Sequence, residues 1–328
     1  MDTTKYTAVI ILNYNNVEDT INCVKSVEKF NTAPIKFVIV DNGSKRADAV
    51  SILDDAFKKT FQNRYKRFGE FDNVQKLPYV SFIVSETNDG YACGNNKGLR
   101  FAKMDDDIDK ILILNNDVLF IEDIIPQLCQ ALEKLPFAGI VSPILYKKDM
   151  NGIDYNCARL NQTNWQIIFT YLFLFKNFFG IMSRYLNSQF ILKKYKNSLK
   201  NEYLKIELPS GSCMLFKKSL MDTIMLFDPQ TFLYFEENIL YKQLEFNGLQ
   251  NYLLTKLKCI HLGASSTNKV SNTFIASTSL NSAIYYLKKY GNMTFMQKLF
   301  LGIAKRVFML KLEILDSFHR NNSSLIIQ

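Results

Sequence analysis

The feature that most constrains the fold is an alternation that occurs four times in the first 145 residues. Each time a short apolar run ends in a polar loop, and a segment of helical periodicity follows. The apolar runs lie at 6–13, 36–40, 80–84 and 110–114. The helical segments are expected at 18–30, 47–61, 99–104 and 121–135, with a further short strand at 138–142. This order predicts an α/β fold with a mostly parallel, doubly wound central sheet and helices on both of its faces.

The polar loops between these segments all follow the carboxyl ends of predicted strands. They lie at 13–16, 41–44, 88–98 and 115–117, and the third of them is rich in glycine. Ligands of open α/β sheets bind outside the carboxyl ends of the strands. We therefore expect the four loops to converge on one cleft.

The pattern changes after residue 145. A basic, aromatic-rich insertion at about 155–203 is expected to be helical, and a strand-type stretch returns at 206–216. A helix is predicted at 238–247, where Gly248 suits its C-terminal cap, and the chain is expected to be helical from about 274 onward. This divides the chain into a catalytic domain at 1–270, which includes the insertion, and a basic, amphipathic helical tail at 271–328.

The net charge of +9 belongs to two segments. Residues 155–201 contain seven basic and no acidic side chains, and residues 285–328 contain seven basic and two acidic ones. Both segments are also rich in Phe, Leu, Ile and Tyr, and binding to nucleic acid would not explain that apolar content. A membrane surface with anionic lipids explains both properties. Helices with one buried face and one solvated basic face are the alternative.

The cellular compartment is predicted from cysteines and apolar runs. The six cysteines show no paired spacing and are expected to be reduced thiols. No basic stretch followed by an apolar run marks a signal peptide at the N-terminus. The longest apolar run, 167–175, is about half of the ~20 residues that a spanning helix needs. We expect a cytoplasmic protein held peripherally at the inner face of the cell membrane.

The segment Asn115-Asn116-Asp117 directly follows a predicted strand and is a candidate metal site. A carboxylate fixed at a strand end is a hard oxygen ligand that suits Mg²⁺ or Mn²⁺. Such a metal can neutralise the charge that develops on a leaving diphosphate. His261, one of two histidines, can supply a nitrogen ligand to the same ion. A simple Asn/Asp turn and a hydrogen-bonded core histidine are the alternatives.

Glu236 and Glu237 end an aromatic run at 232–235 and are candidate general bases. Bulky rings exclude water from a neighbouring carboxylate, which raises its pKa. Adjacent side chains point in different directions, so that one can face the cleft while the other anchors a loop. A helix N-terminus, where the dipole favours acids, would explain the same pair, and both interpretations can hold together.

Three further positions suit a nucleotide. The turn around Gly211 is built from small residues and lets a substrate approach the backbone closely. Asp41 can accept a hydrogen bond from the N3–H of uracil or thymine, and Tyr14 can stack on that ring.

Taken in order, these segments closely resemble the inverting, GT-A-fold glycosyltransferases of family 2, particularly a bacterial rhamnosyltransferase-like branch. The resemblance covers about residues 6–270. Its motifs are Val9-Ile-Ile-Leu-Asn-Tyr-Asn15, Val38-Ile-Val-Asp-Asn-Gly-Ser44, Asn88-Asp-Gly-Tyr-Ala-Cys-Gly-Asn-Asn-Lys-Gly98, Ile113-Leu-Asn-Asn-Asp117, Gly211-Ser-Cys-Met-Leu-Phe216 and Phe232-Leu-Tyr-Phe-Glu-Glu237, followed by His261 and Ser265.

The resemblance implies a role for each matching residue. It implies a metal, Mg²⁺ or Mn²⁺, on Asp117 and His261, and Glu237 as the catalytic base with Glu236 as the fallback. The nucleotide-sugar donor, carrying UDP, dTDP or GDP, would be bound by residues of the strand-end loops: Tyr14, Asn15, Asp41, Asn88, Gly90, Asn96, Asn115 and Gly211. The acceptor would be a glycan or a lipid-linked glycan of cell-surface polysaccharide synthesis.

Two positions depart from the family pattern. The metal motif often begins with Asp and here begins with Asn115, and the base motif usually ends in Asp and here ends in Glu237. Two other classes of function are the alternatives: a metal-dependent nucleotidyltransferase and a non-catalytic membrane-surface binding protein. The first needs a basic glycine-rich phosphate loop near the N-terminus, which 13–16 is not. The second leaves the coincidence of Asp117, Glu237 and His261 unexplained.

Overall fold

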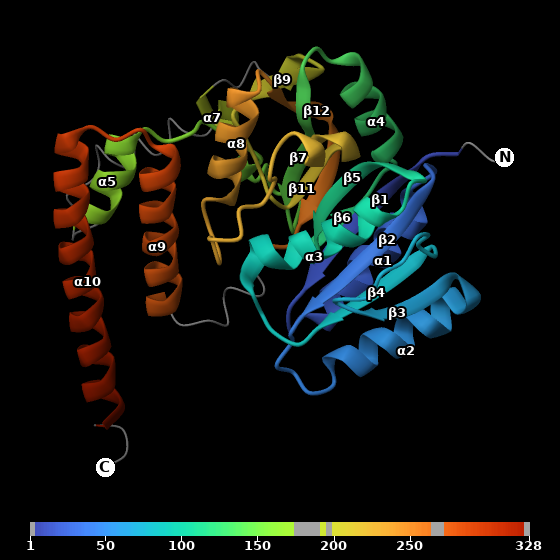
Figure 1. Ribbon diagram of the computed structural model, residues 1–328, viewed down its shortest axis with the longest axis horizontal. Helices are drawn as coiled ribbons and strands as arrows, with labels where there is room; N and C mark the ends of the chain where they lie inside the picture. Colours follow the sequence, from blue (N-terminus) through green and yellow to red (C-terminus); the bar gives the residue numbers. More distant parts are fainter. Residues whose placement is uncertain (1–3, 174–190, 195–198, 264–271, 325–328) are drawn as a thin grey trace.

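A computed structural model describes residues 4–173, 191–194, 199–263 and 272–324 of the chain. The first two thirds form a large twisted sheet covered by helices, and a group of helices stands beside it at the C-terminal end (Figure 1). The sheet has ten strands in the order β3-β4-β2-β1-β5-β11-β7-β12-β6, with β9 paired to β12.

One half of this sheet is parallel. Its strands are β1 (Tyr6–Asn13), β2 (Ile35–Asn42), β3 (Tyr65–Gly69), β4 (Val80–Ser85) and β5 (Ile108–Asn115). β1 lies between β2 and β5, with Asn13 opposite Asp41 and Leu12 opposite Asn115. The carboxyl ends of these three strands therefore lie at one edge, as the alternation of the sequence predicted.

The other half is mixed. Its strands are β6 (Val118–Phe120), β7 (Ala138–Lys147), β9 (Tyr203–Ile206), β11 (Cys213–Lys217) and β12 (Gln250–His261). β11 runs antiparallel to both β5 and β7, whereas β12 runs parallel to β7 and antiparallel to β6 and β9. A separate two-stranded ladder joins β8 (Ala158–Arg159) to β10 (Leu208–Pro209).

Helices cover both faces of the sheet, because successive side chains of the buried strands point to opposite faces. Val9, Ile11 and Phe37 pack in one core with α1 (Val17–Phe30), α2 (Ala49–Phe61) and α4 (Ile125–Lys134). Ile10 and Val38 pack in the other core with α3 (Gly90–Met104) and α8 (Glu236–Phe246).

The prediction of a glycine-rich loop over residues 88–98 is wrong, because α3 already begins at Gly90. The glycines at 94 and 98 let the helix approach the sheet closely. A Cβ at Gly94 would lie 2.7 Å from a methyl group of Leu12, and one at Gly98 would lie 2.6 Å from a methyl group of Ile10. The two glycines therefore allow α3 to pack closely on the strands. In the sequence, the number of glycines in this segment had indicated a loop instead of a helix.

The strands that were not predicted include β3 and β6, and also β8 and β9, which fall within or at the end of the insertion expected to be helical. The exposed residues of β3 and the three-residue length of β6 leave no apolar run in the sequence. The predicted cap is present, because Gly248 follows α8 with a φ of +70°.

The C-terminal helices form a third core. α5 (Asn164–Leu172), from the basic insertion, packs with α9 (Asn272–Tyr290) and α10 (Phe295–Ser324) around Ile168, Tyr286 and Leu301. A further short helix of the insertion is α7 (Ile191–Lys194). Within the described residues, none of the helices combines the length and the apolar character that crossing a membrane requires.

Candidate active site

Asp117 lies in the turn between β5 and β6, at the carboxyl edge of the sheet. Its backbone oxygen accepts a hydrogen bond from the amide of Leu262 at 2.8 Å, and His261 pairs with Val118 across β12 and β6. This pairing brings two residues 144 positions apart together, with His261 Nε2 3.5 Å from Asp117 Oδ2. The predicted pair of metal ligands is therefore assembled in the structure.

The imidazole of His261 is held from its other side. Its Nδ1 lies 2.8 Å from Asp154 Oδ2, and Ser212 Oγ lies 3.3 Å from Nε2. Burial lowers the pKa of His261, but the hydrogen bonds to Asp117 and Asp154 outweigh it and raise the pKa to about 9. Sequence reasoning missed Asp154, because it lies in an irregular segment after β7 that carries no motif.

The residues present fit a divalent cation. Asp117 Oδ1 is buried and has no hydrogen-bond partner among the described residues, so that one carboxylate oxygen is available. A pKa of about 9 leaves a proton on Nε2 at neutral pH, and a metal that binds there would displace it, while the hydrogen bond from Nδ1–H to Asp154 holds the ring in the tautomer required. Among the described residues no group of three or more His, Cys, Asp or Glu side chains could hold an ion. Protein ligands would thus be few, which suits an ion that takes its other ligands from phosphate and water.

The two glutamates begin α8 after a strained stretch of backbone. Tyr234 and Phe235 both have positive φ angles, of 74° and 69°. Such a conformation costs about 1–3 kcal/mol for a residue with a side chain and persists only where the surroundings enforce it. The strain sets the direction in which α8 starts, and with it the direction of Glu236 and Glu237.

Glu237 faces the strand edge. Its Oε1 accepts a hydrogen bond from the amide of Gly211 at 3.1 Å and lies 3.6 Å from Nη2 of Arg159. The side chain is 21% exposed, so that a substrate hydroxyl can reach it. Arg159, in the short strand β8, is a second residue that sequence reasoning missed.

Glu236 points the other way, into the protein, and is 4% exposed. Burial, followed by the charge of Glu237, raises its pKa to about 8. Its Oε1 has no partner among the described residues. A carboxyl group in this position is protonated at neutral pH and cannot be reached by an acceptor, so the geometry favours Glu237 over Glu236 as the base.

The backbone at 211–212 connects the two halves of the site. Gly211 contacts Glu237, and the next residue, Ser212, contacts His261. Tyr91 completes this centre by donating from its hydroxyl to the carbonyl of Gly211 at 2.7 Å. Burial raises the pKa of Tyr91 well above its usual value, and the charges of Glu237, Glu236 and Asp117 raise it further. The acids predicted as base and as metal ligand therefore surround one tyrosine.

Asp41 joins the same edge through a chain of buried hydrogen bonds. Its Oδ2 accepts from Asn13 Nδ2 at 2.7 Å, and Asn13 Oδ1 accepts from the hydroxyl of Thr20 at 2.8 Å. That hydroxyl oxygen accepts in turn from Asn116 at 3.0 Å. Asp41 is itself fully buried and also accepts from Ser44. It thus organises the loops at the strand ends, and the nucleotide-base role predicted for it remains a prediction.

The other predicted donor-binding residues fall into two groups. Tyr14 is half-buried beside Asn15, whose amide donates to Ser44 Oγ and whose φ is 58°. Asn88 Oδ1 accepts from the amide of Gly90, which closes the turn before α3. Tyr14, Asn15 and Asn88 lie in strand-end loops, as expected, whereas Gly90 is the first residue of α3.

The second group, Asn115 and Asn96, bonds to backbone carbonyl groups of other segments. Asn115 donates from its amide to the carbonyl of Ser212 and so joins β5 to the central turn. Asn96 lies within α3 and donates to the carbonyl of Phe227, so it fastens the segment before α8. Its predicted place in a donor-binding loop is wrong in that respect, because residue 96 is helical. Ser265 lies outside the described residues.

A model of a known protein family matches two thirds of the chain. The match is to glycosyl transferase family 2 and covers residues 8–225. The chain belongs to glycosyl transferase family 2. The match ends before Glu236, Glu237 and His261, so that for these residues the geometry carries the argument.

Relatives of this family 2 protein include the low-salt glycan biosynthesis hexosyltransferase Agl10 of Haloferax volcanii. It is 22% identical over 230 residues, which cover 70% of the chain but only 58% of that relative. The chain is also similar to a solved structure of GalNAc-T7 with UDP, GalNAc and Mn²⁺, at a TM-score of 0.59 and 12% identity, covering 95% of the chain and 57% of the other. The mannosyltransferase PcManGT of Pyrobaculum calidifontis, solved with GDP-Man and Mn²⁺, matches with a TM-score of 0.53 and 12% identity, over 98% of the chain and 80% of the other.

At such low identity these structures establish the fold alone. That fold is GT-A, with a mixed central sheet and a C-terminal helical part, so the fold predicted from the motifs is confirmed. Family membership also favours glycosyl transfer over the two other classes, the nucleotidyltransferase and the non-catalytic binding protein.

Proposed function

We propose that this protein is an inverting, metal-dependent glycosyltransferase that moves a hexosyl or deoxyhexosyl group from a nucleotide-diphosphate sugar to an acceptor hydroxyl. One observation carries the proposal: the candidate base, Glu237, contacts Gly211, and His261 contacts the next residue of the same turn. Asp117, the other candidate metal ligand, lies 3.5 Å from His261. A base on one side and a diphosphate-binding centre on the other suit an in-line displacement at a sugar carbon between them.

The protein groups have separate tasks in this mechanism. Glu237 takes the proton of the acceptor hydroxyl, while the amide of Gly211 and the guanidinium of Arg159 keep its carboxylate oriented. Asp117 and His261 would hold the metal, which when bound neutralises the charge on the leaving nucleoside diphosphate. Asp154 keeps the imidazole in position. Attack opposite to the departing diphosphate inverts the configuration at the sugar carbon.

The classes of donor and acceptor are proposed from the residues at the strand ends and from the similar proteins. Tyr14 is proposed to stack on the base and Asp41 to accept the hydrogen bond from its N3–H, which would suit UDP or dTDP, and GDP remains a candidate because the PcManGT structure contains GDP-Man. The name of the archaeal relative supports a glycan acceptor, free or lipid-linked. We retain the rhamnosyltransferase-like bacterial branch as a prediction from the motifs. Mg²⁺ and Mn²⁺ are both candidates, and Mn²⁺ is the ion in the two similar structures.

The test is release of nucleoside diphosphate from a panel of UDP-, dTDP- and GDP-sugars, with Mn²⁺, Mg²⁺ or EDTA. We expect one donor class to be hydrolysed slowly in the presence of metal. Asp117→Ala should weaken Mn²⁺-dependent nucleotide binding more than about 100-fold, since the lost ligand is worth several kcal/mol. Asp106→Ala is the matched control, because Asp106 is exposed just before the same strand that Asp117 follows. Unchanged Mn²⁺-dependent affinity in Asp117→Ala would remove the metal role.

We also propose that the protein works at the inner face of the cell membrane, attached through α10. This helix turns Leu301, Ala304 and Leu312 toward α5 and α9. Its opposite side exposes large apolar side chains along one stripe: Phe295, Met296, Leu299, Ile303, Leu310 and Ile314.

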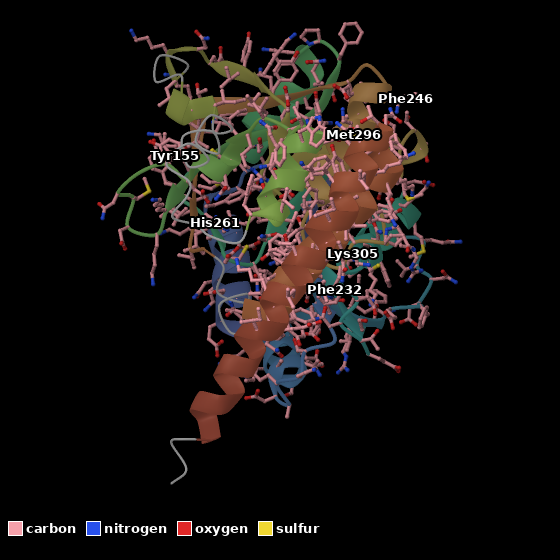
Figure 2. All side chains as sticks on the ribbon, turned by 90° about the vertical axis from the view of Figure 1, so that its left-hand side faces the viewer. Tyr155, Phe232, Phe246, His261, Met296 and Lys305 are labelled. Atoms are coloured by element: carbon pink, nitrogen blue, oxygen red, sulfur yellow. The ribbon has the colours of Figure 1, made fainter. Side chains whose placement is uncertain are left out.

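Basic residues accompany this stripe. Lys298, Lys305 and Arg306 are exposed on the same helix, and Figure 2 shows α10 across the outer side of the molecule with Met296 and Lys305 on it. An apolar stripe flanked by basic residues suits the interface of an anionic lipid surface.

Sedimentation with vesicles tests this attachment. Wild type should bind vesicles that contain phosphatidylglycerol and bind pure phosphatidylcholine vesicles less. The variant Leu299→Ser/Ile303→Ser/Leu310→Ser should lose most of the binding, while the control Phe71→Ser, at an exposed site far from α10, should keep it. A wild-type protein that ignores anionic vesicles and forms dimers that the triple variant abolishes would assign the stripe to a second copy of the chain.

A further inference from the structure

A hollow of about 490 Å³ lies beside the candidate active site, where the helical group meets the catalytic fold. Figure 1 shows α8 between the sheet and the helices α9, α5 and α10. The walls come from the start of α5, from α8 and from the turn between α9 and α10. Their lining includes Asn161, Gln162, Glu207, Tyr241, Lys242 and Tyr290.

The lining combines amide side chains with tyrosine rings. Gln162 and Asn292 make no side-chain hydrogen bond to another described residue, and an amide offers both donors and an acceptor. Tyr241 on α8 and Tyr290 on α9 are half-buried, and Tyr290 is backed by the buried ring of Tyr286 at 6.3 Å between ring centres. A sugar ring carries hydroxyl groups that each donate and accept, and a patch of C–H groups that packs on aromatic rings. The chemistry of the walls therefore matches a saccharide.

The charges of the walls argue against a second nucleotide site. Lys242 is the single cation among the lining residues and is paired with Glu245 at 2.7 Å. Glu207 adds a carboxylate, one oxygen of which accepts from the amide of Asn161 at 2.6 Å. A diphosphate in this hollow would meet no free cation among the described residues, so a neutral ligand fits better.

Two short connections join the hollow to the candidate base. Asn161 follows Arg159 by two residues, and Arg159 lies against Glu237. The side chain of Asn161 accepts from Asn238, the neighbour of Glu237, at 2.7 Å and donates to Tyr286 at 2.9 Å. On α8, Tyr241 comes one turn after Glu237, a rise of about 6 Å. The hollow is thus joined to Glu237 both along α8 and through the segment that carries Arg159 and Asn161.

We propose that this hollow binds a sugar unit of the acceptor glycan, one or more residues away from the hydroxyl that is glycosylated. The inference rests on the proposed function, and it names the part of the chain that recognises the acceptor. Because the turn before α10 forms one wall, a glycan that reaches this hollow also passes close to the helix proposed to contact lipid.

Saturation-transfer-difference NMR tests the hollow directly. The probes are methyl glycosides of glucose, galactose, mannose, rhamnose and N-acetylglucosamine, added to the full chain at millimolar concentration without donor or metal. We expect at least one to bind, about fivefold more weakly to Gln162→Ala and about tenfold more weakly to Tyr241→Ala. Gln127→Ala and Tyr203→Ala are matched controls at exposed sites away from the hollow and should bind as wild type.

A second measurement separates this inference from the proposed function. Metal-dependent hydrolysis of the donor needs no acceptor, so Gln162→Ala and Tyr241→Ala should hydrolyse it at the wild-type rate. Equal glycoside binding by wild type and both variants, displacement of the glycoside by nucleoside diphosphate, or absence of binding by every probe would each overturn the assignment, even if hydrolysis confirms the transferase. Loss of hydrolysis in wild type with intact, Gln162-dependent glycoside binding would instead overturn the proposed reaction and keep the saccharide site.

Discussion

The strand-end region and the C-terminal helical region use their side chains in opposite ways. At the strand ends, polar groups point inward and bond to one another, as in the buried chain from Asp41 through Asn13 and Thr20 to Asn116. In α10, large apolar side chains point outward, and Phe295 is 80% exposed. Buried polar networks fix geometry, whereas exposed apolar stripes need a partner surface. The contrast supports the proposals that the first region carries the chemistry and that the second contacts a lipid surface.

A single buried carboxylate fastens the two regions together. Asp228 Oδ2 accepts from the hydroxyl of Tyr285 at 2.8 Å, the ammonium of Lys289 at 2.8 Å and the hydroxyl of Tyr290 at 2.6 Å. Burial raises the pKa of Asp228, but these hydrogen bonds outweigh it and lower the pKa. The loop before α8 therefore holds α9, and with it one wall of the hollow.

The largest effect is expected from Glu237→Gln. Glutamine keeps the hydrogen bond to Gly211 but cannot accept a proton, so transfer should fall about 10²-fold or more while donor affinity stays the same. Steady-state transfer and calorimetry of nucleotide binding give the two values. The control is Glu133→Gln, at an exposed position of α4, and its transfer rate and donor affinity should be those of wild type. Near-normal transfer by Glu237→Gln would place the base elsewhere.

Asp154→Ala should come next. It removes the hydrogen bond that orients His261, and such outer partners change metal affinity about 10–100-fold. Mn²⁺ titration followed by electron paramagnetic resonance measures the affinity, and the NMR shifts of the two ring nitrogens report the tautomer. Asp149→Ala, an exposed residue of the same connection, should change neither. An unaltered tautomer together with unaltered Mn²⁺ affinity would show that Asp154 has no positioning role.

Asp228→Ala tests the connection between the regions. We expect a loss on the order of 2 kcal/mol in unfolding free energy, because buried hydrogen bonds to a charged group disappear. Hydrogen exchange should quicken in α9 and the start of α10 but not in β1 or β5. Asp222→Ala removes an exposed ion pair with Lys103, and as the control it should leave the unfolding free energy almost unchanged. Exchange that is equally fast throughout the chain would mean that the two regions unfold as one unit.

A further effect concerns Glu236 and the dependence of stability on pH. Its pKa in the folded protein is about 8, above the ordinary value of 4.5, so the folded chain holds a proton that the unfolded chain releases. This contribution is complete below pH 4.5 and is lost as pH rises to about 8, with a slope of at most about 1.4 kcal/mol per pH unit. Glu236→Gln should flatten the decline in urea stability between pH 5 and 8. Parallel curves for wild type and variant would contradict the buried, protonated state.

Much of the fold could be predicted from local pattern. Continuous apolar runs such as 6–13 and 110–114 marked β1 and β5 because strands buried on both faces admit few polar residues. The polar residues that follow them marked the ligand edge for the same reason. Asp117, Glu237 and His261 could be named because each follows such a run.

The sequence misled where the decisive contact was distant. The sequence predicts a loop around Gly94 and Gly98, because nothing in the local sequence reveals that Leu12 and Ile10 lie against these glycines. Asp154 and Arg159 have no motif, and their importance comes only from the side chains they meet, His261 and Glu237.

By itself, then, the sequence determined the order of strands and helices and the polar residues at the strand ends, because periodicity and burial are local properties of a chain. Tertiary structure alone decided that Glu237 faces the cleft while Glu236 is buried, and that Asp117 meets His261. It also decided that α10 exposes one apolar side while α5 and α9 cover the other. These outcomes depend on which elements pack together, and contacts between residues a hundred or more positions apart leave no trace in local composition.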